Sequence, residues 1–421
     1  MAAVKQILRE VLEEITPSKE ERASTLKTVN TFLAELNKSL KKNKLSAKAV
    51  LGGSYAKDTW LKGDYDVDIF VRFALKHKKD NLSSLLEKTL KPWKAEKVHG
   101  SRDYFWVHEK KFRFEIIPVL AIKKAADAEN VTDFSPLHVK WVNKNGRKYK
   151  GDIRLFKKFC KAQRVYGAES YIRGFSGHVV DILVIYYKGF LPLLKAAAKW
   201  KPKTIIDYYH HYNKKALFVL NRSKIQGPLV VIDPVQKERN AAAALSQDKY
   251  NGLVSAAKKF LKRPSKDFFV ETEIDLGKLA KLGHMIHVCA KVPKGKEDII
   301  GTRLLHVFEY LKRYLEDFGI KASGWRWNKG EMAEFWYVVK EKELPATMTR
   351  AGPPLELKKA AEAFKKKHKK TFVSNHRLMA EVRRKHRTPE DAIRTASSDD
   401  YVKHRQIRLS IIGKDACNGQ H

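Results

Sequence analysis

The stretch GGSYAKDTWLKGDYDVDIFVRF (52–73) decides the fold of the N-terminal part of the chain. Its second half alternates, with apolar side chains on one face and Asp64, Asp66 and Asp68 on the other, which is typical of a half-buried strand. Carboxylates two residues apart on a strand point the same way and repel each other unless a cation neutralises them. Mg²⁺ prefers carboxylate oxygens together with substrate phosphates. We therefore expect Asp66 and Asp68 to hold metal ions beside a nucleoside triphosphate.

The simpler interpretation of Asp66 and Asp68 is an exposed acidic strand face in a very basic protein, because short motifs often match by chance. Two features favour the metal site instead. The small-residue turn at 52–54 precedes the strand, and glycine lets a backbone approach a ligand closely. The hydrophobic alternation then supplies a rigid strand for the two carboxylates.

The net charge points to a polyanionic partner. The chain has 421 residues, of which 43% are hydrophobic, and a formal net charge of +38. Its length allows two to four domains. Such self-repulsion suits a nucleic-acid partner, since binding releases counterions and gains affinity. An anionic membrane is the competing partner, but no apolar run approaches the roughly 20 residues that span a bilayer.

The cysteines and the first residues indicate the compartment. Cys160, Cys289 and Cys417 lie far apart in the sequence, which argues against a zinc site and a disulfide scaffold and favours a reducing cytoplasm. The N-terminal stretch MAAVKQILREVLEEI lacks the apolar core of a signal peptide. We therefore expect a cytoplasmic protein.

The periodicity predicts an α+β protein of several domains. Two helices within 1–44 break at Thr16-Pro17-Ser18, where Ser18 and Glu21 form a capping-box pattern. A small mixed sheet with helices on one side should follow, because a β-α-β-β order comes next. Its expected elements are strands at Ala47–Leu51, around Asp66–Asp68, at Tyr104–His108 and at Phe112–Val119, and a helix around Asn81–Leu90.

Further along, helical and α+β segments follow. We expect helices at 153–167, 175–194, 241–246, 250–263 and Ile299–Phe318, and strands at 229–233, His284–Val292, Ala322–Trp327 and Glu334–Val339. The predicted domains are a catalytic head (1–145), a helical neck (146–264), an α+β body (265–345) and a basic tail (346–421).

Two basic runs lie in the tail, KKKHKK (365–370) and RRKHR (383–387). Each run alone is usually a solvated face. Together, in a protein of this charge, they fit a surface that follows a phosphate backbone. The RNA-binding candidates are Lys365, Lys366, Lys367, Lys369, Lys370, Arg383 and Arg384.

Glu115 is the candidate for a third carboxylate. It lies in the alternating stretch KFRFEIIPV (111–119), which could form a strand beside the one that carries Asp66 and Asp68. Nucleotidyl transfer needs charge neutralisation on phosphate oxygens, and two metal ions can also activate the attacking hydroxyl. The alternative for Glu115 is an edge-strand residue paired with a lysine.

Six segments together resemble a known family. In chain order they are GGSYAKDTWLKGDYDVDIF (52–70), SPLHVKW (135–141), RLFKKFCKAQRVYGAESYIRGFSGH (154–178), DPVQKERNAAAALS (233–246), RAGPPLEL (350–357) and SNHRLMAEVRRKHRTPEDAIR (374–394). They resemble the archaeal CCA-adding enzymes, which are class I tRNA nucleotidyltransferases. The first segment is shared with the wider polymerase-β-like superfamily, whereas the RGFSG and DPV…RN segments are more selective.

The resemblance implies roles for individual residues. Asp66 and Asp68 would hold two Mg²⁺ ions, and Glu115 would lie nearest the primer hydroxyl. The family commonly has Asp at the third position, so Glu115 is a departure that affects metal geometry and rate. The implied nucleotide-binding set is Ser54, Lys57, His138, Lys157, Tyr166, Arg239 and Asn240.

Within this set, Ser54 and Lys57 match residues that face the triphosphate, and Arg239 matches the arginine that helps select the base. Lys157 and Tyr166 match contacts to the triphosphate and sugar. Each residue has a simpler alternative. Lys157 and Arg239 could be surface charges. Tyr166 could be a core aromatic, and His138 a packed or capping histidine.

The implied function is template-independent addition of C, C and A to the 3′ end of tRNA, using CTP and ATP and releasing pyrophosphate. The implied partner surfaces are the acceptor stem and elbow of tRNA, for a monomer or a homodimer. Three alternatives remain open at this point: a poly(A) polymerase-like enzyme, an oligoadenylate-synthetase-like enzyme and a non-catalytic RNA-binding protein.

Overall fold

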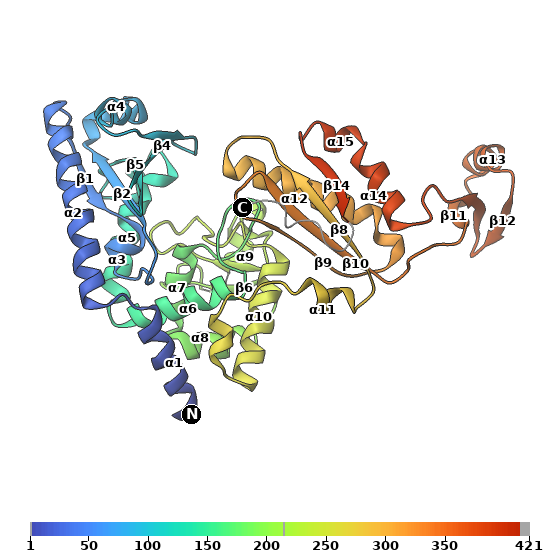
Figure 1. Cartoon of the computed structure of the whole chain (residues 1–421), viewed down its shortest axis with the longest axis horizontal. Coiled ribbons are helices and arrows are strands. Elements are labelled where there is room, and N and C mark those ends of the chain that lie inside the picture. The colour runs from blue at the N-terminus through green and yellow to red at the C-terminus, as the bar shows by residue number, and fades with distance from the viewer. Residues whose placement is uncertain (1, 214, 413–421) are drawn as a thin grey trace. The chain divides into compact units, whose positions relative to one another are not determined.

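The computed structural model describes residues 2–213 and 215–412 (Figure 1). The chain divides into two compact units, Met1–Thr272 and Glu273–His421. Within the described residues, no helix combines the length and the apolar character needed to cross a bilayer.

A five-stranded mixed sheet forms the first part of the N-terminal unit, with the order β1-β2-β5-β4-β3. Its strands are β1 (Ala47–Leu51), β2 (Asp66–Phe73), β3 (Glu96–Val98), β4 (Tyr104–Glu109) and β5 (Phe112–Leu120). β2 and β5 pair in parallel, and the other neighbours are antiparallel. This confirms the predicted mixed sheet and the predicted neighbour of β2. The three residues of β3 are too few to show an alternating pattern.

Helices cover this sheet and link it to the rest of the unit. They are α1 (Ala2–Ile15), α2 (Lys19–Lys42), α3 (Gly53–Lys57), α4 (Leu82–Thr89) and α5 (Ser135–Asn145). The Ser18 side chain accepts a hydrogen bond from the backbone N–H of Glu21, as the capping pattern predicts. Phe32 of α2 stacks on Phe114 of β5 with ring centroids 4.0 Å apart. The head core therefore lies between α2 and the sheet.

The rest of this unit is mostly helical. Its elements are α6 (Lys150–Ala162), α7 (Gly177–Tyr187), α8 (Phe190–Ala197), α9 (Ala216–Val219), α10 (Gln247–Lys262), β6 (Thr204–Ile206) and β7 (Leu229–Val231). Arg154 of α6 is 6% exposed and hydrogen-bonds Asp58 and the carbonyl of Trp60. This buried contact ties α6 to the C-terminal end of α3.

One predicted helix in this region is divided into two helices, and another was wrong. The helix expected over 175–194 is broken at Lys188 and Gly189, whose φ angles of 61° and 129° are left-handed. The stretch 241–246 forms turns rather than a helix, because the Asn240 side chain accepts the N–H of Ala242 and fixes a turn there. Both breaks come from backbone conformations that apolar patterning does not show.

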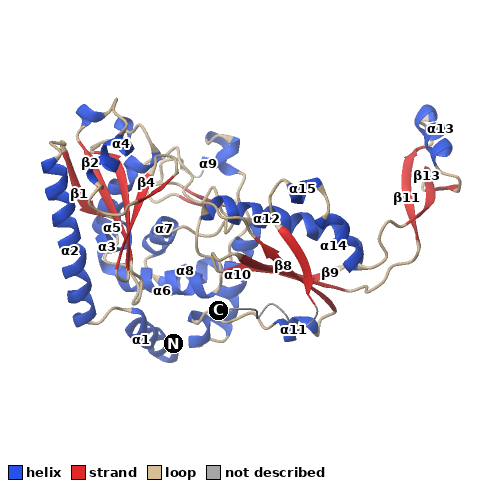
Figure 2. Cartoon of the chain, turned by 45° about the horizontal axis from the view of Figure 1, so that its top comes forward, coloured by secondary structure: helices blue, strands red, loops and turns tan. Residues whose placement is uncertain are grey.

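The C-terminal unit contains two antiparallel sheets. The first has the order β14-β8-β10-β9, built from β8 (His284–Lys291), β9 (Ile320–Trp327), β10 (Met332–Val339) and β14 (Arg408–Ile412). Figure 2 shows α12 (Glu297–Tyr314) and α14 (Pro389–Ser397) against this sheet. Leu304 and Leu311 of α12 share a core with Phe335 and Tyr337 of β10. The predicted strands and helix of this region are confirmed with small shifts at their ends.

The second sheet has the order β11-β13-β12, from β11 (Thr347–Pro354), β12 (Thr371–Ser374) and β13 (Arg377–Arg383), with α13 (Lys358–Lys367) beside it. The remaining helices of this unit are α11 (Leu276–Ala280) and α15 (Asp400–Lys403). Short 3₁₀ helices lie at Leu75–His77, Ala125–Asp127, Val131–Phe134, Arg147–Tyr149, Arg222–Ile225, Lys266–Phe269 and Glu316–Phe318.

The cysteines differ in state. Cys160 in α6 is a buried free thiol. Cys289 in β8 is disulfide-bonded, which the wide spacing of the cysteines had not led us to expect. Cys417 lies outside the described residues.

Candidate active site

The parallel pair β2 and β5 brings three carboxylates to one face of the sheet. Asp68 lies directly opposite Glu115, and Asp66 lies opposite Arg113. Neighbouring strands are about 5 Å apart, and residues two apart on a strand share a face. Asp66, Asp68 and Glu115 therefore project from one corner of the sheet.

The three carboxylates do not yet converge. Asp66 is exposed, and its Oδ2 accepts a hydrogen bond from Arg113 at 2.9 Å. Glu115 Oε2 accepts one from the indole N–H of Trp106 on β4 at 3.2 Å. The ligand oxygens of the three residues therefore do not all lie within 4.8 Å of one another. A cation that all three residues ligate would therefore need these side chains to move closer together.

The electrostatics of this corner fit a cation. Burial, and then the charge of Asp68, raise the pKa of Glu115 to about 7. Burial likewise raises the pKa of Asp68, although Lys57 and Lys157 oppose that shift. Two carboxylates that resist ionisation because they are crowded and partly desolvated gain stability when a divalent ion neutralises them.

The glycine-serine turn is the start of the short helix α3, which lies against Asp68. A Cβ at Gly53 would lie 1.6 Å from Asp68 Oδ2, and its φ of +48° is left-handed. A Cβ at Gly52 would lie 2.5 Å from the ring of Phe70. Only glycine fits at these two positions, so the first turn of α3, which includes Ser54, lies beside Asp68.

Lys57, at the end of α3, is held by the neck. Its Nζ lies 2.5 Å from Oδ2 of Asp181 on α7, which is a buried carboxylate. An ammonium group has three donors, so two of them remain for phosphate oxygens. The ion pair fixes Lys57 near Asp68, whose ionisation it favours.

Lys157 and Tyr166 belong to the same neighbourhood. Lys157 of α6 is 5% exposed. Burial, and then the nearby charge of Lys57, lower the pKa of Lys157 to about 8. Burial and Asp181 raise the pKa of Tyr166. Both side chains therefore lie within electrostatic reach of Asp181 and Asp68.

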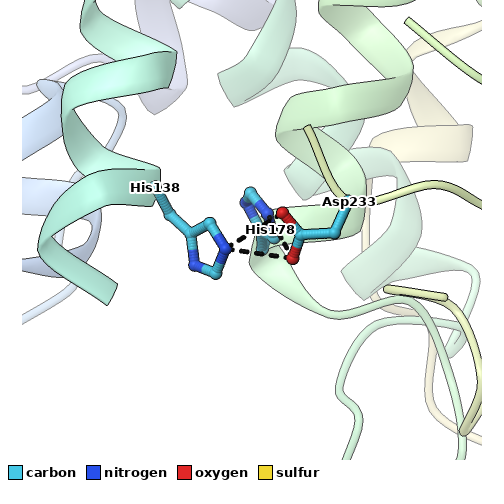
Figure 3. A group of neighbouring side chains, drawn as sticks. All are labelled: His138, His178 and Asp233. Atoms are coloured by element: carbon cyan, nitrogen blue, oxygen red, sulfur yellow. Dashed lines mark hydrogen bonds and ion pairs between the residues drawn. The ribbon is translucent and has the colours of Figure 1, made fainter. Parts of the chain in front are cut away.

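A second cluster contains Arg239 and two histidines around Asp233; Figure 3 shows His138, His178 and Asp233. Asp233 Oδ2 lies 2.6 Å from Arg239 Nη1, 3.0 Å from His138 Nε2 and 3.6 Å from His178 Nε2. Asp233 is fully buried, whereas the Arg239 side chain is 41% exposed. Although burial opposes ionisation, the hydrogen bond from His138 and the nearby ring of His178 hold the pKa of Asp233 well below its usual range.

His178 and Asp233 were not among the candidate residues from the sequence. Their partners are far away in the chain, since His138 and Asp233 are 95 residues apart. The available signal was their position inside the two most selective segments, at the end of RGFSGH and at the start of DPVQKERN.

Asn240 lies next to Arg239 but faces the backbone. Its Oδ1 accepts the N–H groups of Val231 and Ala242, and its Nδ2 donates to the carbonyls of Lys224 and Leu229. All its side-chain hydrogen bonds therefore shape the turn that carries Arg239.

The run 365–370 covers the end of α13 and the turn before β12, and the run 383–387 begins at the last residue of β13. Six of the seven candidate cations are exposed: Lys365, Lys366, Lys367, Lys369, Lys370 and Arg383. Arg384 differs because its side chain is 18% exposed and pairs with Asp317 at 2.8 Å. Arg384 is therefore less available to an RNA phosphate than the other six.

A parallel strand pair that carries carboxylates beside a glycine-rich helix start is typical of nucleotidyltransferases. The nucleotidyltransferase domain model matches residues 33–128. The solved structures of a cytoplasmic RNA terminal U-transferase (TM-score 0.51, 15% identity) and of the terminal uridylyl transferase Cid1 (TM-score 0.52, 13% identity) share the fold. Each match covers 65% of this chain, and they cover 100% and 99% of those chains.

Two further family models are more specific. The second domain of tRNA nucleotidyltransferase matches residues 151–270, and the C-terminal domain of CCA-adding enzymes matches residues 283–412. The CCA-adding enzyme of Nanoarchaeum equitans is 35% identical over 86% of this chain and 89% of its own. That of Pyrobaculum islandicum is 29% identical over 98% of this chain and 97% of its own. This chain therefore belongs to the CCA-adding enzymes, which confirms the resemblance found in the sequence. Nucleotidyltransferases of this fold generally use divalent metal ions.

Proposed function

We propose that this tRNA nucleotidyltransferase adds C, C and A to the tRNA 3′ end by two-metal nucleotidyl transfer at the acidic corner of β2 and β5. The observation that carries the proposal is the register that places Asp68 opposite Glu115, with the pKa of Glu115 raised to about 7. Family membership supports the substrate class, since its relatives are named as CCA-adding enzymes.

Asp66, Asp68 and Glu115 are the residues that would hold two Mg²⁺ ions. Bound there, the ions would neutralise the triphosphate and activate the primer hydroxyl. The crowded carboxylates and the absence of a Cβ at Gly53 fit such a group. Glu115 is one methylene longer than the usual Asp, and the Trp106 hydrogen bond holds its carboxylate back over the sheet.

The triphosphate side of the site would be formed by Ser54, Lys57 and Lys157. Lys57 keeps two N–H donors free of Asp181. Lys157 carries a charge at neutral pH because its pKa is about 8. Fixed cations of this kind stabilise the charge that develops on departing pyrophosphate, at no cost of reorganisation.

The base side would be formed by Arg239, with Tyr166 at the sugar and with His138 and Asn240 in support. Cytosine and adenine both present a ring-nitrogen acceptor beside an exocyclic amine, whereas uracil and guanine present a ring N–H donor there. A guanidinium offers only donors in a rigid fork. Arg239 can therefore donate a hydrogen bond to the ring nitrogen of C or A. With U or G, its N–H group would face the ring N–H donor instead.

The exposed lysines of the C-terminal unit would contact tRNA. A-form RNA is recognised mainly through its backbone and 2′-hydroxyl groups, which suits the exposed cations of α13, of the turn after it and of β13. We propose that they reach the acceptor stem or elbow, from a monomer or a homodimer in the cytoplasm. The four domains then follow the roles: a head for metals (1–145), a neck for the nucleotide (146–264), and a body and tail for tRNA (265–345 and 346–421).

The test uses tRNA transcripts that end before CCA, with labelled CTP, then ATP, with and without Mg²⁺. The proposal predicts growth by two C residues and one A, followed by a halt, and no growth without Mg²⁺. Transcripts with a periodate-oxidised 3′ end are the matched control, because they lack the attacking hydroxyl. Open-ended addition of A would instead show a poly(A) polymerase, and tRNA binding without transfer would show a non-catalytic RNA-binding protein.

A further inference from the structure

Asp233 is a buried carboxylate to which nothing so far assigns a role. It is 0% exposed. Its Oδ1 accepts the backbone N–H groups of Val235 and Gln236 at 2.9 and 3.3 Å. A buried charge is costly unless it is fully hydrogen-bonded. The hydrogen-bond donors around Asp233 therefore stabilise its ionised form in this buried position.

That charge controls the orientation of Arg239. One guanidinium nitrogen, Nη1, donates to Asp233 Oδ2 at 2.6 Å. The backbone is tied as well, since the N–H of Asp233 donates to the Arg239 carbonyl at 3.0 Å. One arm of the rigid fork is fixed and 41% of the side chain is exposed, so the guanidinium can offer its remaining donors to a ligand from a fixed position.

His138 and His178 close the other side of the carboxylate. Their rings lie 3.9 Å apart at an interplanar angle of 30°, and His138 Nε2 contacts Asp233 at 3.1 Å. Burial, and then His138, lower the pKa of His178 to about 4. His178 is thus neutral near pH 7. Its Nε2 lies 3.6 Å from Asp233 Oδ2 without a hydrogen bond, so the ring packs against the carboxylate and does not compete with Arg239 for its charge.

The helix α7 connects this cluster to the triphosphate side. His178 lies in its first turn, and three residues later Asp181 binds Lys57 at 2.5 Å. Ser176 caps the helix by accepting the N–H of Val179. One helical turn therefore positions side chains for both ends of a bound nucleotide.

We propose that Asp233, supported by His138 and His178, is the positioning residue that aims Arg239 and thereby sets the preference for CTP and ATP over UTP and GTP. The inference rests on the proposed function. His138, His178 and Asp233 could also hold a metal ion, because one ligand atom from each lies within 4.8 Å of the other two. The Arg239 cation, however, already occupies Asp233 Oδ2 at 2.6 Å, so positioning is the role that the geometry favours.

The variant Asp233→Asn tests the proposal, with Asp133→Asn as its matched control. Asp133 is also 0% exposed, also pairs with an arginine, Arg102, at 2.5 Å, and also accepts backbone N–H groups. Both variants lose a buried charge, so both should lower the melting temperature. Only Asp233→Asn should lower the CTP-over-UTP ratio of kcat/KM, by about tenfold or more. An equal ratio in the two variants would overturn the proposal.

A double-mutant cycle distinguishes an effect of Asp233 on the orientation of Arg239 from a general loss of structure. If Asp233 acts through Arg239, Asp233→Asn should lower selectivity no further in an Arg239→Ala background, whereas independent sites would add. His178→Asn serves if Asp233→Asn does not fold, and it should lower the same ratio in the same direction. Unchanged selectivity in His178→Asn, or additive losses in the cycle, would overturn the proposal.

Two measurements test the positioning role of Asp233 without depending on nucleotidyl transfer. Equilibrium binding of CTP and UTP is measured on enzyme bound to tRNA with a 3′-deoxy end, where transfer is blocked. The ratio of the two affinities then tests the role of Asp233 even if the wild type extends no tRNA. Metal analysis of the purified wild type is the second readout. Stoichiometric zinc that is absent from Asp233→Asn would show a metal site and overturn the positioning role.

Discussion

At the scale of single residues, the proposed site contains ionisable groups whose charged forms are destabilised by burial and by nearby like charges. Glu115 and Asp68 resist ionisation because they are crowded and partly desolvated, and Lys157 resists protonation because it is buried. Each of these shifts opposes folding of the free enzyme. A bound cation would stabilise the ionised carboxylates, and a bound phosphate would stabilise the protonated lysine. Groups with such shifted pKa values are common at functional sites for this reason.

Lys157 gives a pH prediction. Its pKa is about 8, so its charge is present below pH 8 and is lost as the pH rises through that value. We expect the KM for CTP to rise above pH 8 in the wild type. Arginine stays charged in proteins, so Lys157→Arg should keep a flat KM over the same range.

The measurement is KM against pH from about 6.5 to 9.5, with Lys158→Arg, the next residue along α6, as control. A bound triphosphate favours the charged amine, so the midpoint in the enzyme–nucleotide complex should lie above pH 8. The prediction fails if Lys157→Arg shows the same rise in KM as the wild type.

The pKa of Lys157 also affects folding stability. Its folded pKa lies below the ordinary lysine value of 10.5, so the unfolded chain binds more protons between about pH 8 and 10.5. The contribution of Lys157 to stability should therefore increase with pH across this window. Lys157→Met should be more stable than the wild type at pH 7, and melting temperatures at pH 7 and 10 would measure the difference.

At the scale of elements, the sheet could be predicted and the breaks between helices could not. β2 and β5 were found because alternation over eight or nine residues is a local signal. The break at Lys188 depends on a left-handed residue inside an apolar run. The turn after Asn240 depends on a side chain that bonds Val231 and Leu229 of β7. Such features depend on tertiary contacts that a single stretch of sequence does not reveal.

Gly53 gives the prediction at this scale. Gly53→Ala would add a Cβ 1.6 Å from Asp68 Oδ2, so α3 or Asp68 must move. Gly63 is the matched control, because its φ of +77° is also left-handed but a Cβ there meets nothing within 4 Å. Both variants should lose about 1–2 kcal/mol from backbone strain.

Only Gly53→Ala should also reduce single-turnover CTP addition, while its tRNA affinity stays unchanged. Thermal unfolding and the single-turnover rate are the two measurements. If Gly53→Ala and Gly63→Ala keep equal rates, the close approach of α3 to Asp68 has no catalytic importance.

At the scale of the whole molecule, the net charge of +38 was the first sign of a nucleic-acid partner. The structure locates part of it on exposed lysines of α13 and the turn that follows. The neighbourhood of the proposed catalytic carboxylates could be predicted because these residues sit on one strand and its neighbour. The Asp233 cluster could not, since its members come from three segments that meet only in the folded unit.

Charge reversal of Lys365, Lys366 and Lys367 to Glu should weaken tRNA binding and flatten its salt dependence. The slope of log K against log salt should fall by roughly 0.7–0.9 for each tRNA phosphate that the variant no longer neutralises. Lys41, Lys42 and Lys44, which are exposed at the end of α2, provide a control with the same change in net charge. Equal slopes for the two triple variants would show that the α13 lysines are merely solvated.

The most direct test of the acidic corner compares wild-type enzyme with Asp68→Asn on a tRNA that ends before CCA. The mass of the product tRNA is measured after incubation with CTP, ATP and Mg²⁺, and tRNA affinity is measured in parallel. We predict a product longer by C, C and A for the wild type, a rate lower by at least about 10³-fold for the variant, and equal tRNA affinity. Transfer by Asp68→Asn at the wild-type rate would contradict the account.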